Sequence, residues 1–140
     1  MNTPHASSPF ASLKINHAAI RVPDFDTGVA WYADKLDFRL RQSVSLAGLT
    51  FSFLYPAADD SFHFELLAGP GAAERSTYKD LHDSDKMSGW HHPGFRVDSV
   101  EDTIDELKRR GVTIISDPHD VAAMDNLKEV TPGISMADSI

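Results

Sequence analysis

The chain has 140 residues, which suits one compact domain or two small modules, and 41% of them are apolar, enough for a real core. Its formal net charge of −8 would repel a phosphate backbone, so no nucleic-acid partner is expected. It has no cysteine, and no apolar run reaches the roughly 18 residues that a membrane span needs. Its first residues lack the basic and apolar regions of a secretory signal, so we expect a cytoplasmic protein without membrane contact.

The first half of the chain is predicted to form a βαβββ module over residues 13–68, after a flexible polar arm over 1–12. Ile20 and Val22 alternate with His17, Ala19 and Arg21, which indicates a strand. Apolar residues then recur at helical spacing through FDTGVAWYADKL, with Asp24 or Asp26 as the N-cap. Three strand-like runs follow, at 38–46, 49–55 and 62–68.

The second half repeats the start of this pattern. A polar linker over 69–90 separates the first module from a second one, predicted over 91–140. The alternation in HPGFRV predicts a strand, and VEDTIDEL predicts a helix that follows Ser99 as its N-cap and ends before Gly111. A further strand is expected at 112–117, and beyond it the pattern weakens.

The two halves match at an offset of 75 residues (92 − 17). With HAAIRVPDFDTGVAWYADKL laid over HPGFRVDSVEDTIDELKRRG, His17 meets His92 and Arg21 meets Arg96. The apolar positions stay in phase through the helix. A match of this length predicts two copies of one structural unit.

The duplicated strands each have one apolar face and one face that carries a His and an Arg. His63 and Glu65 likewise share one face of their strand. If the modules pack about a pseudo-twofold axis, His17, Glu65 and His92 gather at one place. Two imidazoles and a carboxylate suit a divalent cation (Fe, Mn, Zn, Ni or Co) and leave positions open for a substrate.

These residues resemble the vicinal oxygen chelate superfamily, which includes glyoxalase I, extradiol dioxygenases, methylmalonyl-CoA epimerase and bleomycin-resistance proteins. The resemblance rests on INHAAIRVPDFDTGVAWYADKLDFRL, FHFELL and GWHHPGFRVDSVEDTIDELKRRGV. It implies an α+β fold in which two tandem βαβββ modules form a curled mixed sheet with a central cleft and helices outside. It also implies a metal bound by His17, Glu65 and His92, the last being preferred to His91 because it is in phase with His17.

The end of the chain departs from the family pattern. The family usually closes its second module with a strand similar to FxDPxGNxxEL, whose Glu is the last ligand. The spacing between the first two predicted ligands, applied to His92, reaches Ile140, and neither Glu129 nor Asp138 matches well. Either the tail supplies an unusual ligand, or the site has three protein ligands, or the second module lacks its last strand. A second subunit would cover such an open edge, and the resemblance implies a homodimer.

The resemblance implies a metal-dependent enzyme that binds a small substrate through two adjacent oxygens. Isomerase, lyase and ring-cleaving dioxygenase chemistry all remain open, with Glu65, or a carboxylate of the C-terminal tail that is displaced from the metal, as the catalytic base. The alternative is a metal-free small-molecule-binding protein of the bleomycin-resistance type, which the missing closing motif favours.

Three further side chains are predicted to contact the substrate, and each has an alternative interpretation. His63 is either a substrate contact or a solvated strand position. Phe53 alternates with two other aromatic residues that either line the cleft or fill the core. Arg96, like Arg21 in the first module, either binds a substrate carboxylate or forms an ion pair with one of the many acidic residues.

Overall fold

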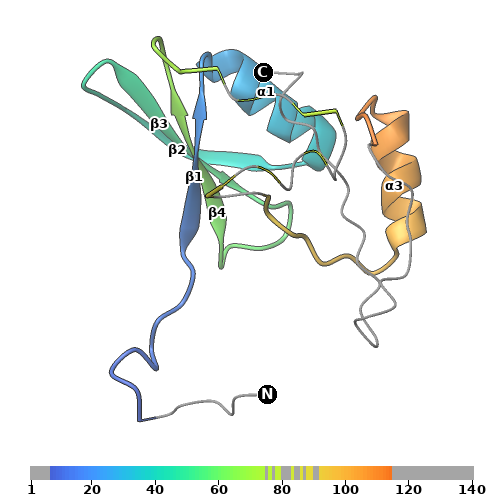
Figure 1. The fold of residues 1–140 in the computed structure, drawn as a ribbon, viewed down its shortest axis with the longest axis horizontal. Coiled ribbons are helices and arrows are strands. Elements are labelled where there is room, and N and C mark those ends of the chain that lie inside the picture. The colour runs from blue at the N-terminus through green and yellow to red at the C-terminus, as the bar shows by residue number, and fades with distance from the viewer. Residues whose placement is uncertain are drawn as a thin grey trace.

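The computed structural model describes residues 7–74, 76, 78–79, 83, 86, 88–89 and 92–114. Its elements are, in chain order, β1 (His17–Val22), α1 (Phe25–Leu36), β2 (Arg39–Leu46), β3 (Leu49–Tyr55), β4 (His63–Ala68) and α3 (Val100–Arg109). The strands form one curled, open sheet in the order β1-β4-β3-β2, in which β1 runs parallel to β4 and the other neighbours are antiparallel. Helix α1 packs on one face of the sheet, and α3 lies beside α1, farther from the strands (Figure 1). The fold is therefore mixed α+β with its helices outside, as the sequence predicts.

The first module follows its sequence pattern closely. The predicted strands at 38–46, 49–55 and 62–68 agree with β2, β3 and β4 to within one residue at each end. Asp24 is the N-cap of α1, because its carboxylate accepts a hydrogen bond from the backbone N–H of Thr27 at 2.8 Å. Asp26 instead lies in the first turn, where a negative charge suits the helix dipole.

The core lies between α1 and the sheet. Along β1, Ala18, Ile20 and Val22 pack toward α1, whereas the residues between them are exposed. This alternation fixes which face of the strand carries its polar side chains. The buried core residues come from β1, α1, β3, β4 and the residue just before β2: Val22, Tyr32, Phe38, Leu54, Phe64, Leu66 and Ala68.

Two glycines shape the end of the sheet where β2 turns into β3. Ala47 and Gly48 have positive φ angles of 52° and 81°, as a two-residue hairpin turn requires. Gly69, at φ 144°, follows β4 and lies against this turn, where a Cβ would come within 2.8 Å of Leu49 Cδ2. A side chain at residue 69 would therefore push the two chain segments apart.

The second half keeps its predicted helix but not the strand predicted before it. Ser99 caps α3 by accepting a hydrogen bond from the backbone N–H of Asp102 at 3.2 Å, and Gly111 follows the helix with a φ of 77°. Residues 92–97 form no strand, which corrects the expectation from HPGFRV. Residues 112–114 are not in a strand either, and the rest of the expected strand lies outside the described residues.

Residues 92–97 join the first module through an aromatic contact instead. The ring of Phe95 meets those of Phe38 and Phe64 edge-on, with centroids 6.3 and 5.9 Å apart. An extended segment counts as a strand only when a neighbour shares its backbone hydrogen bonds, and period-two patterning does not supply that neighbour. Phe95 therefore packs against the core although its segment does not pair with another strand.

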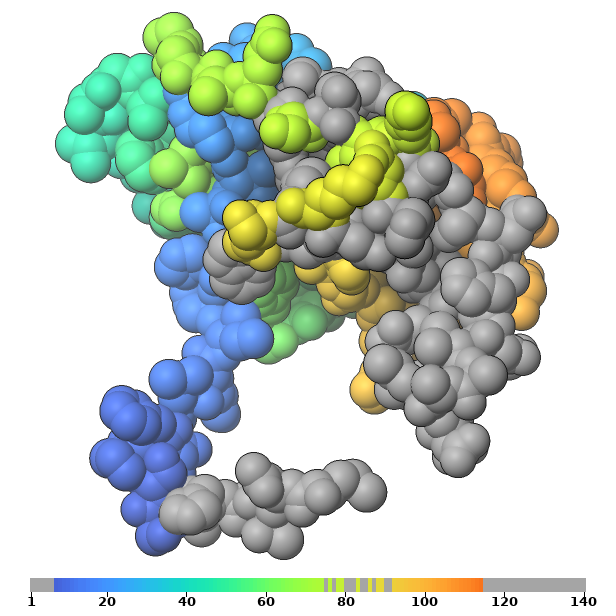
Figure 2. Space-filling model, in the orientation of Figure 1, coloured from blue at the N-terminus to red at the C-terminus, as the bar shows by residue number. Residues whose placement is uncertain are grey.

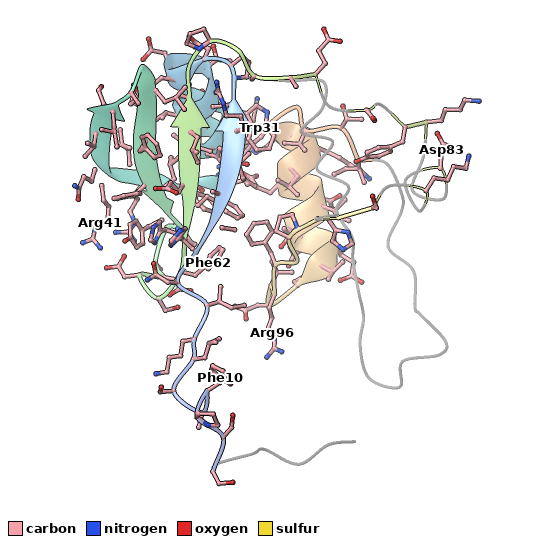
Figure 3. The ribbon with its side chains drawn as sticks, turned by 60° about the vertical axis from the view of Figure 1, so that its left-hand side comes forward. Phe10, Trp31, Arg41, Phe62, Asp83 and Arg96 are labelled. Carbon is pink, nitrogen blue, oxygen red and sulfur yellow. The ribbon has the colours of Figure 1, made fainter. Side chains whose placement is uncertain are left out.

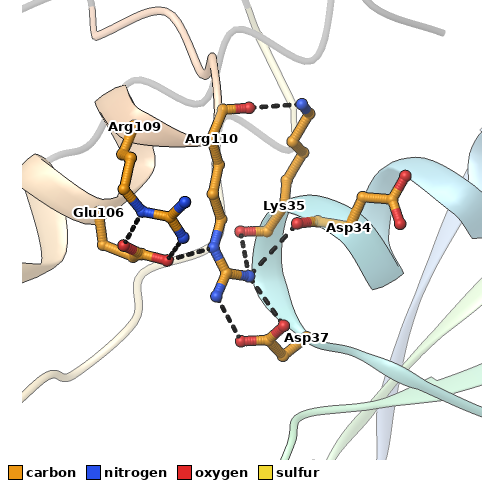
Figure 4. Close-up of polar contacts among 6 residues, drawn as sticks. All are labelled: Asp34, Lys35, Asp37, Glu106, Arg109 and Arg110. Atoms are coloured by element: carbon orange, nitrogen blue, oxygen red, sulfur yellow. Dashed lines mark hydrogen bonds and ion pairs between the residues drawn. The ribbon is translucent and has the colours of Figure 1, made fainter.

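Arg110 ties α3 to the end of α1 (Figure 4). Its guanidinium donates to both carboxylate oxygens of Asp37, at 2.8 and 2.9 Å, and to Glu106 at 2.6 Å. Lys35 returns a hydrogen bond to the backbone carbonyl of Arg110 at 2.5 Å. This bidentate, charge-assisted contact fixes the position of α3 relative to the first module.

Residues 7–16, which precede β1, extend away from the body of the protein (Figure 2). Phe10 in this segment is 71% exposed, although it is large and apolar. No helix among the described residues is long and apolar enough to cross a membrane.

Candidate functional site

The candidate site lies on the open face of the sheet, opposite α1. In the parallel pairing of β1 with β4, His17 stands directly opposite His63, and Glu65 follows two residues later on the same face. The Nε2 atom of His17 and the Oε2 atom of Glu65 are 4.0 Å apart. The structure therefore brings together two of the three predicted metal ligands. They come from the first and the last strand of the first module, which are far apart in the sequence and adjacent in the sheet.

Asn16 lies directly before β1 and contacts the other nitrogen of the same imidazole. Its Oδ1 atom is 2.9 Å from His17 Nδ1. Because a carboxamide oxygen can only accept a hydrogen bond, Nδ1 is the donor. Sequence analysis missed Asn16, since it precedes the alternating pattern and only its position next to the histidine marks it.

His63 is enclosed by other rings rather than solvated. It is 7% exposed and stacks between His17 and Tyr55, with ring centroids 5.2 and 4.7 Å away, while Phe53 meets it edge-on. Burial, followed by the nearby His17, lowers the pKa of His63 from its ordinary value, which favours the neutral ring. This enclosure contradicts the solvated position that the sequence allowed, whereas a contact between His63 and a substrate stays a prediction.

The stacked rings of His17, His63 and Tyr55 lead to positively charged arginines on β2. Arg41 lies over the face of Tyr55, 5.2 Å from its centroid, at the outer edge of the sheet (Figure 3). Asp60 pairs with both Arg41 and Arg39, at 2.8 and 2.6 Å. The hydrogen bond from Arg39 is the main reason that the pKa of Asp60 is lowered. Two guanidinium groups thus share one carboxylate at this edge.

Arg21 contacts backbone carbonyls instead of the acidic side chain that the sequence suggested as one of its partners. Its guanidinium donates to four backbone carbonyls, those of Val22, Leu67, Gly69 and Pro70. These carbonyls lie at the ends of β1 and β4, where the ladder stops. The side chain therefore holds the strand ends together, and among the described residues no acidic side chain pairs with it.

The remaining predicted site residues are more widely spread. Phe53 is half-buried on the open face, where it pairs with Glu65 across β3 and β4, so the aromatic residues of β3 line this face and do not fill the core. His92 and Arg96 are both exposed, in the segment before α3. Arg96 extends away from α3 and the sheet (Figure 3).

The donor set can be tested against the needs of a metal ion. Nitrogen and oxygen ligands lie about 2.0–2.2 Å from zinc, so two ligand atoms are about 3.5 Å apart on a tetrahedral ion and about 4.3 Å apart when they lie on opposite sides of it. The 4.0 Å between His17 Nε2 and Glu65 Oε2 lies between these two values, so the two atoms would move about 0.5 Å closer to hold a tetrahedral ion. Among the described residues no group of three histidine or acidic side chains is close enough to hold a metal, so the role of His92 stays a prediction.

A family model for the Glyoxalase/Bleomycin resistance protein/Dioxygenase superfamily matches residues 14–125. The chain belongs to this superfamily. Mouse mitochondrial methylmalonyl-CoA epimerase is 27% identical over 118 residues, which cover 84% of this chain and 65% of that enzyme. The chain thus spans less than two thirds of the length of this curated member of the superfamily.

Solved structures of superfamily members share the fold. The trypanothione-dependent glyoxalase I of Leishmania major is 20% identical, with a TM-score of 0.58 over 76% of this chain and 73% of that one. TnmS3, an antibiotic-binding protein from Streptomyces sp. CB03234, is 16% identical, with a TM-score of 0.51 over 79% of each chain. The same fold thus occurs in an enzyme and in a protein described as a binder, so the site must decide between these functions.

Proposed function

We propose that this protein is a metal-dependent enzyme that acts on a small molecule through two adjacent oxygens. The observation that carries this proposal is the convergence of His17 Nε2 and Glu65 Oε2 on the open face of the sheet, 4.0 Å apart. These two atoms would hold the cation, with His92 as a third ligand. Isomerisation, lyase chemistry and ring cleavage all begin with such an arrangement. The similarity to the mouse epimerase supports isomerisation among these three reactions, because an epimerase catalyses an isomerisation.

The bound cation would supply Lewis acidity to the substrate oxygens. The protein's own residues would do the rest. His17, held at Nδ1 by Asn16, keeps its second nitrogen toward the open face. Glu65 has a side chain that is 19% exposed, so it is partly shielded from water, and one carboxylate oxygen can take up a proton from the substrate. Phe53 presents a half-buried ring beside it, against which an apolar part of the substrate would pack.

A second candidate function is metal-free binding of a small molecule. It is favoured by the lack of a third metal-binding side chain near His17 and Glu65 within the described part of the chain. The similarity to TnmS3 agrees with it. On this view the half-buried aromatic rings of β3 are the main binding surface, and the imidazole and carboxylate supply hydrogen bonds.

Metal binding to purified protein separates the two functions. Mn²⁺, Zn²⁺, Ni²⁺, Co²⁺ and, without oxygen, Fe²⁺ would each be titrated calorimetrically into wild type and into the His17→Ala, Glu65→Gln and His92→Ala variants. Glu74→Gln is the matched control, because Glu74 is an exposed carboxylate outside the site. We expect one bound equivalent in wild type and in the control, and weaker binding in the three site variants. Wild type that binds no more metal than a His17→Ala/Glu65→Gln double variant would refute the enzyme proposal.

The homodimer expected from the resemblance also remains a proposal. Among the described residues β1 forms a ladder only with β4, so its outer edge is available to another strand. Light scattering coupled to size-exclusion chromatography should give twice the mass of one chain. A single-chain mass at micromolar concentration would contradict it.

A further inference from the structure

His17 is held from two directions, at one edge of its ring and across one face. At the edge, the Nδ1 atom of His17 forms a hydrogen bond with Asn16 Oδ1. The ring of His63 stacks against one face of the His17 ring. We propose that Asn16 and His63 are positioning residues, which fix the tautomer and the ring plane of His17 before any cation arrives. This inference rests on the proposed function and adds two residues to it that are not themselves ligands.

The contact with Asn16 decides which nitrogen of His17 is free. A neutral imidazole carries one proton, and Asn16 Oδ1 can only accept, so the proton lies on Nδ1. Nε2 therefore keeps its lone pair. This is the nitrogen that lies 4.0 Å from Glu65 Oε2. The carboxamide thus selects the tautomer that a metal ion at this position requires.

This tautomer leaves two acceptors pointing toward each other. The Nε2 lone pair and the carboxylate of Glu65 repel each other unless positive charge lies between them. With the proton on Nε2 instead, an N–H group would face the carboxylate at 4.0 Å, and the repulsion that favours a cation would be absent. The hydrogen bond to Asn16 therefore gives the pair its preference for a cation.

The contact with His63 restricts a different motion. Its ring lies nearly parallel to that of His17, at an interplanar angle of 25°, and is itself held by Tyr55 on its other face. A hydrogen bond in the ring plane and a stacked ring against its face constrain two independent rotations. Because the register of β1 and β4 places the two histidines directly opposite each other, the stack is built into the sheet.

Nitrogen-15 NMR of the metal-free protein tests this directly, because the two imidazole nitrogens have different shifts when one is protonated. At a pH of about 8, where imidazole is neutral, His17 should carry its proton on Nδ1 in wild type. Asn16→Ala should lose this preference, whereas Asn16→Asp, which keeps an acceptor, should retain it. An Nε2–H tautomer in wild type, or an unchanged tautomer in Asn16→Ala, would overturn the role of Asn16.

Titration of Mn²⁺ or Zn²⁺ then measures the consequence. Asn16→Ala should weaken binding by about 10- to 100-fold, and Asn16→Asp should restore it. His63→Phe keeps a ring against His17 and should bind metal within about threefold of wild type, while His63→Ala should bind more weakly. Equal binding by His63→Ala and His63→Phe, both folded by circular dichroism, would overturn the role of His63.

Failure of this inference can be told apart from failure of the proposed function. If His17 has the expected tautomer but wild type binds no metal, the enzyme proposal fails while the assignment of Asn16 stands. If wild type binds metal through His17 and Glu65 with the same affinity in Asn16→Ala, the enzyme proposal stands and this inference fails.

Discussion

Replacing Ser52 by alanine should stabilise the protein. Its hydroxyl oxygen is buried and has no hydrogen-bond partner among the described residues, on a side chain that is fully enclosed. An unsatisfied buried hydroxyl costs about 1–3 kcal/mol. Removing one oxygen atom leaves a void of about 15 Å³, which costs about 0.4 kcal/mol. The net expectation is a gain of about 1 kcal/mol in the free energy of unfolding, which raises Tm by about 2–8 °C.

Ser43 provides a matched control, because it is paired directly with Ser52 across β2 and β3 but is exposed. Urea unfolding of both alanine variants, followed by circular dichroism, compares the same chemical change with and without burial. Ser43→Ala should lie within about 0.5 kcal/mol of wild type. A Ser52→Ala variant that is less stable than wild type would refute the reasoning, because it would mean that the hydroxyl makes a favourable contact.

Three more predictions concern stability. Gly69→Ala should lower the free energy of unfolding by about 2 kcal/mol, because the new Cβ would lie 2.8 Å from Leu49 Cδ2. Gly71→Ala should be less destabilising, because the space around Gly71 is open. The opposite order in urea unfolding would contradict this reasoning. Phe95→Ala should lower the free energy of unfolding by about 2 kcal/mol. A fully buried Phe loses about 3–5 kcal/mol on this change, and Phe95 is 36% exposed. A loss below about 0.5 kcal/mol in urea unfolding would show that its contact with the core does not stabilise the protein. Hydrogen bonds from two arginines lower the pKa of Glu106 to about 2 from its ordinary 4.5, so the stability that it contributes is present above pH 4.5 and is lost as the pH falls toward 2. Acid titration of Glu106→Gln should show a shallower loss over that range, and an unchanged curve would exclude the linkage.

Local patterning predicted the first module well because each of its strands pairs with a neighbour from the same module. The alternation in β1 and β3 marks their buried faces, and Asp24 and Ser99 mark the two helix starts by accepting the hydrogen bonds that a free helix end lacks. Residues 92–97 show where prediction from local patterning fails. Their alternation matches that of β1, but pairing depends on a partner strand elsewhere in the chain, and no local pattern contains that information.

The candidate site was predicted in part for the same reason. Periodicity places His17 and Glu65 on polar strand faces, and the resemblance to the superfamily connects them. The enclosure of His63 could not be predicted, because it depends on rings from β1 and β3 arriving on both of its faces. Arg21 illustrates the opposite problem. Its charge suggested an acidic partner, whereas four carbonyls at the strand ends satisfy it equally well.

The site and the core are coupled through the register of one strand pair. Ala18, Ile20 and Val22 pack toward α1, and this burial alone sets which residues of β1 face outward. A slip of one residue between β1 and β4 would expose those apolar side chains and turn His17 to the buried face, away from Glu65. The separation of 4.0 Å is therefore maintained by hydrophobic burial on the opposite side of the sheet. For that reason the outward face of β1 can accept substitutions such as those at His17 without loss of the fold, and the variants proposed above test the chemistry of the site rather than its folding.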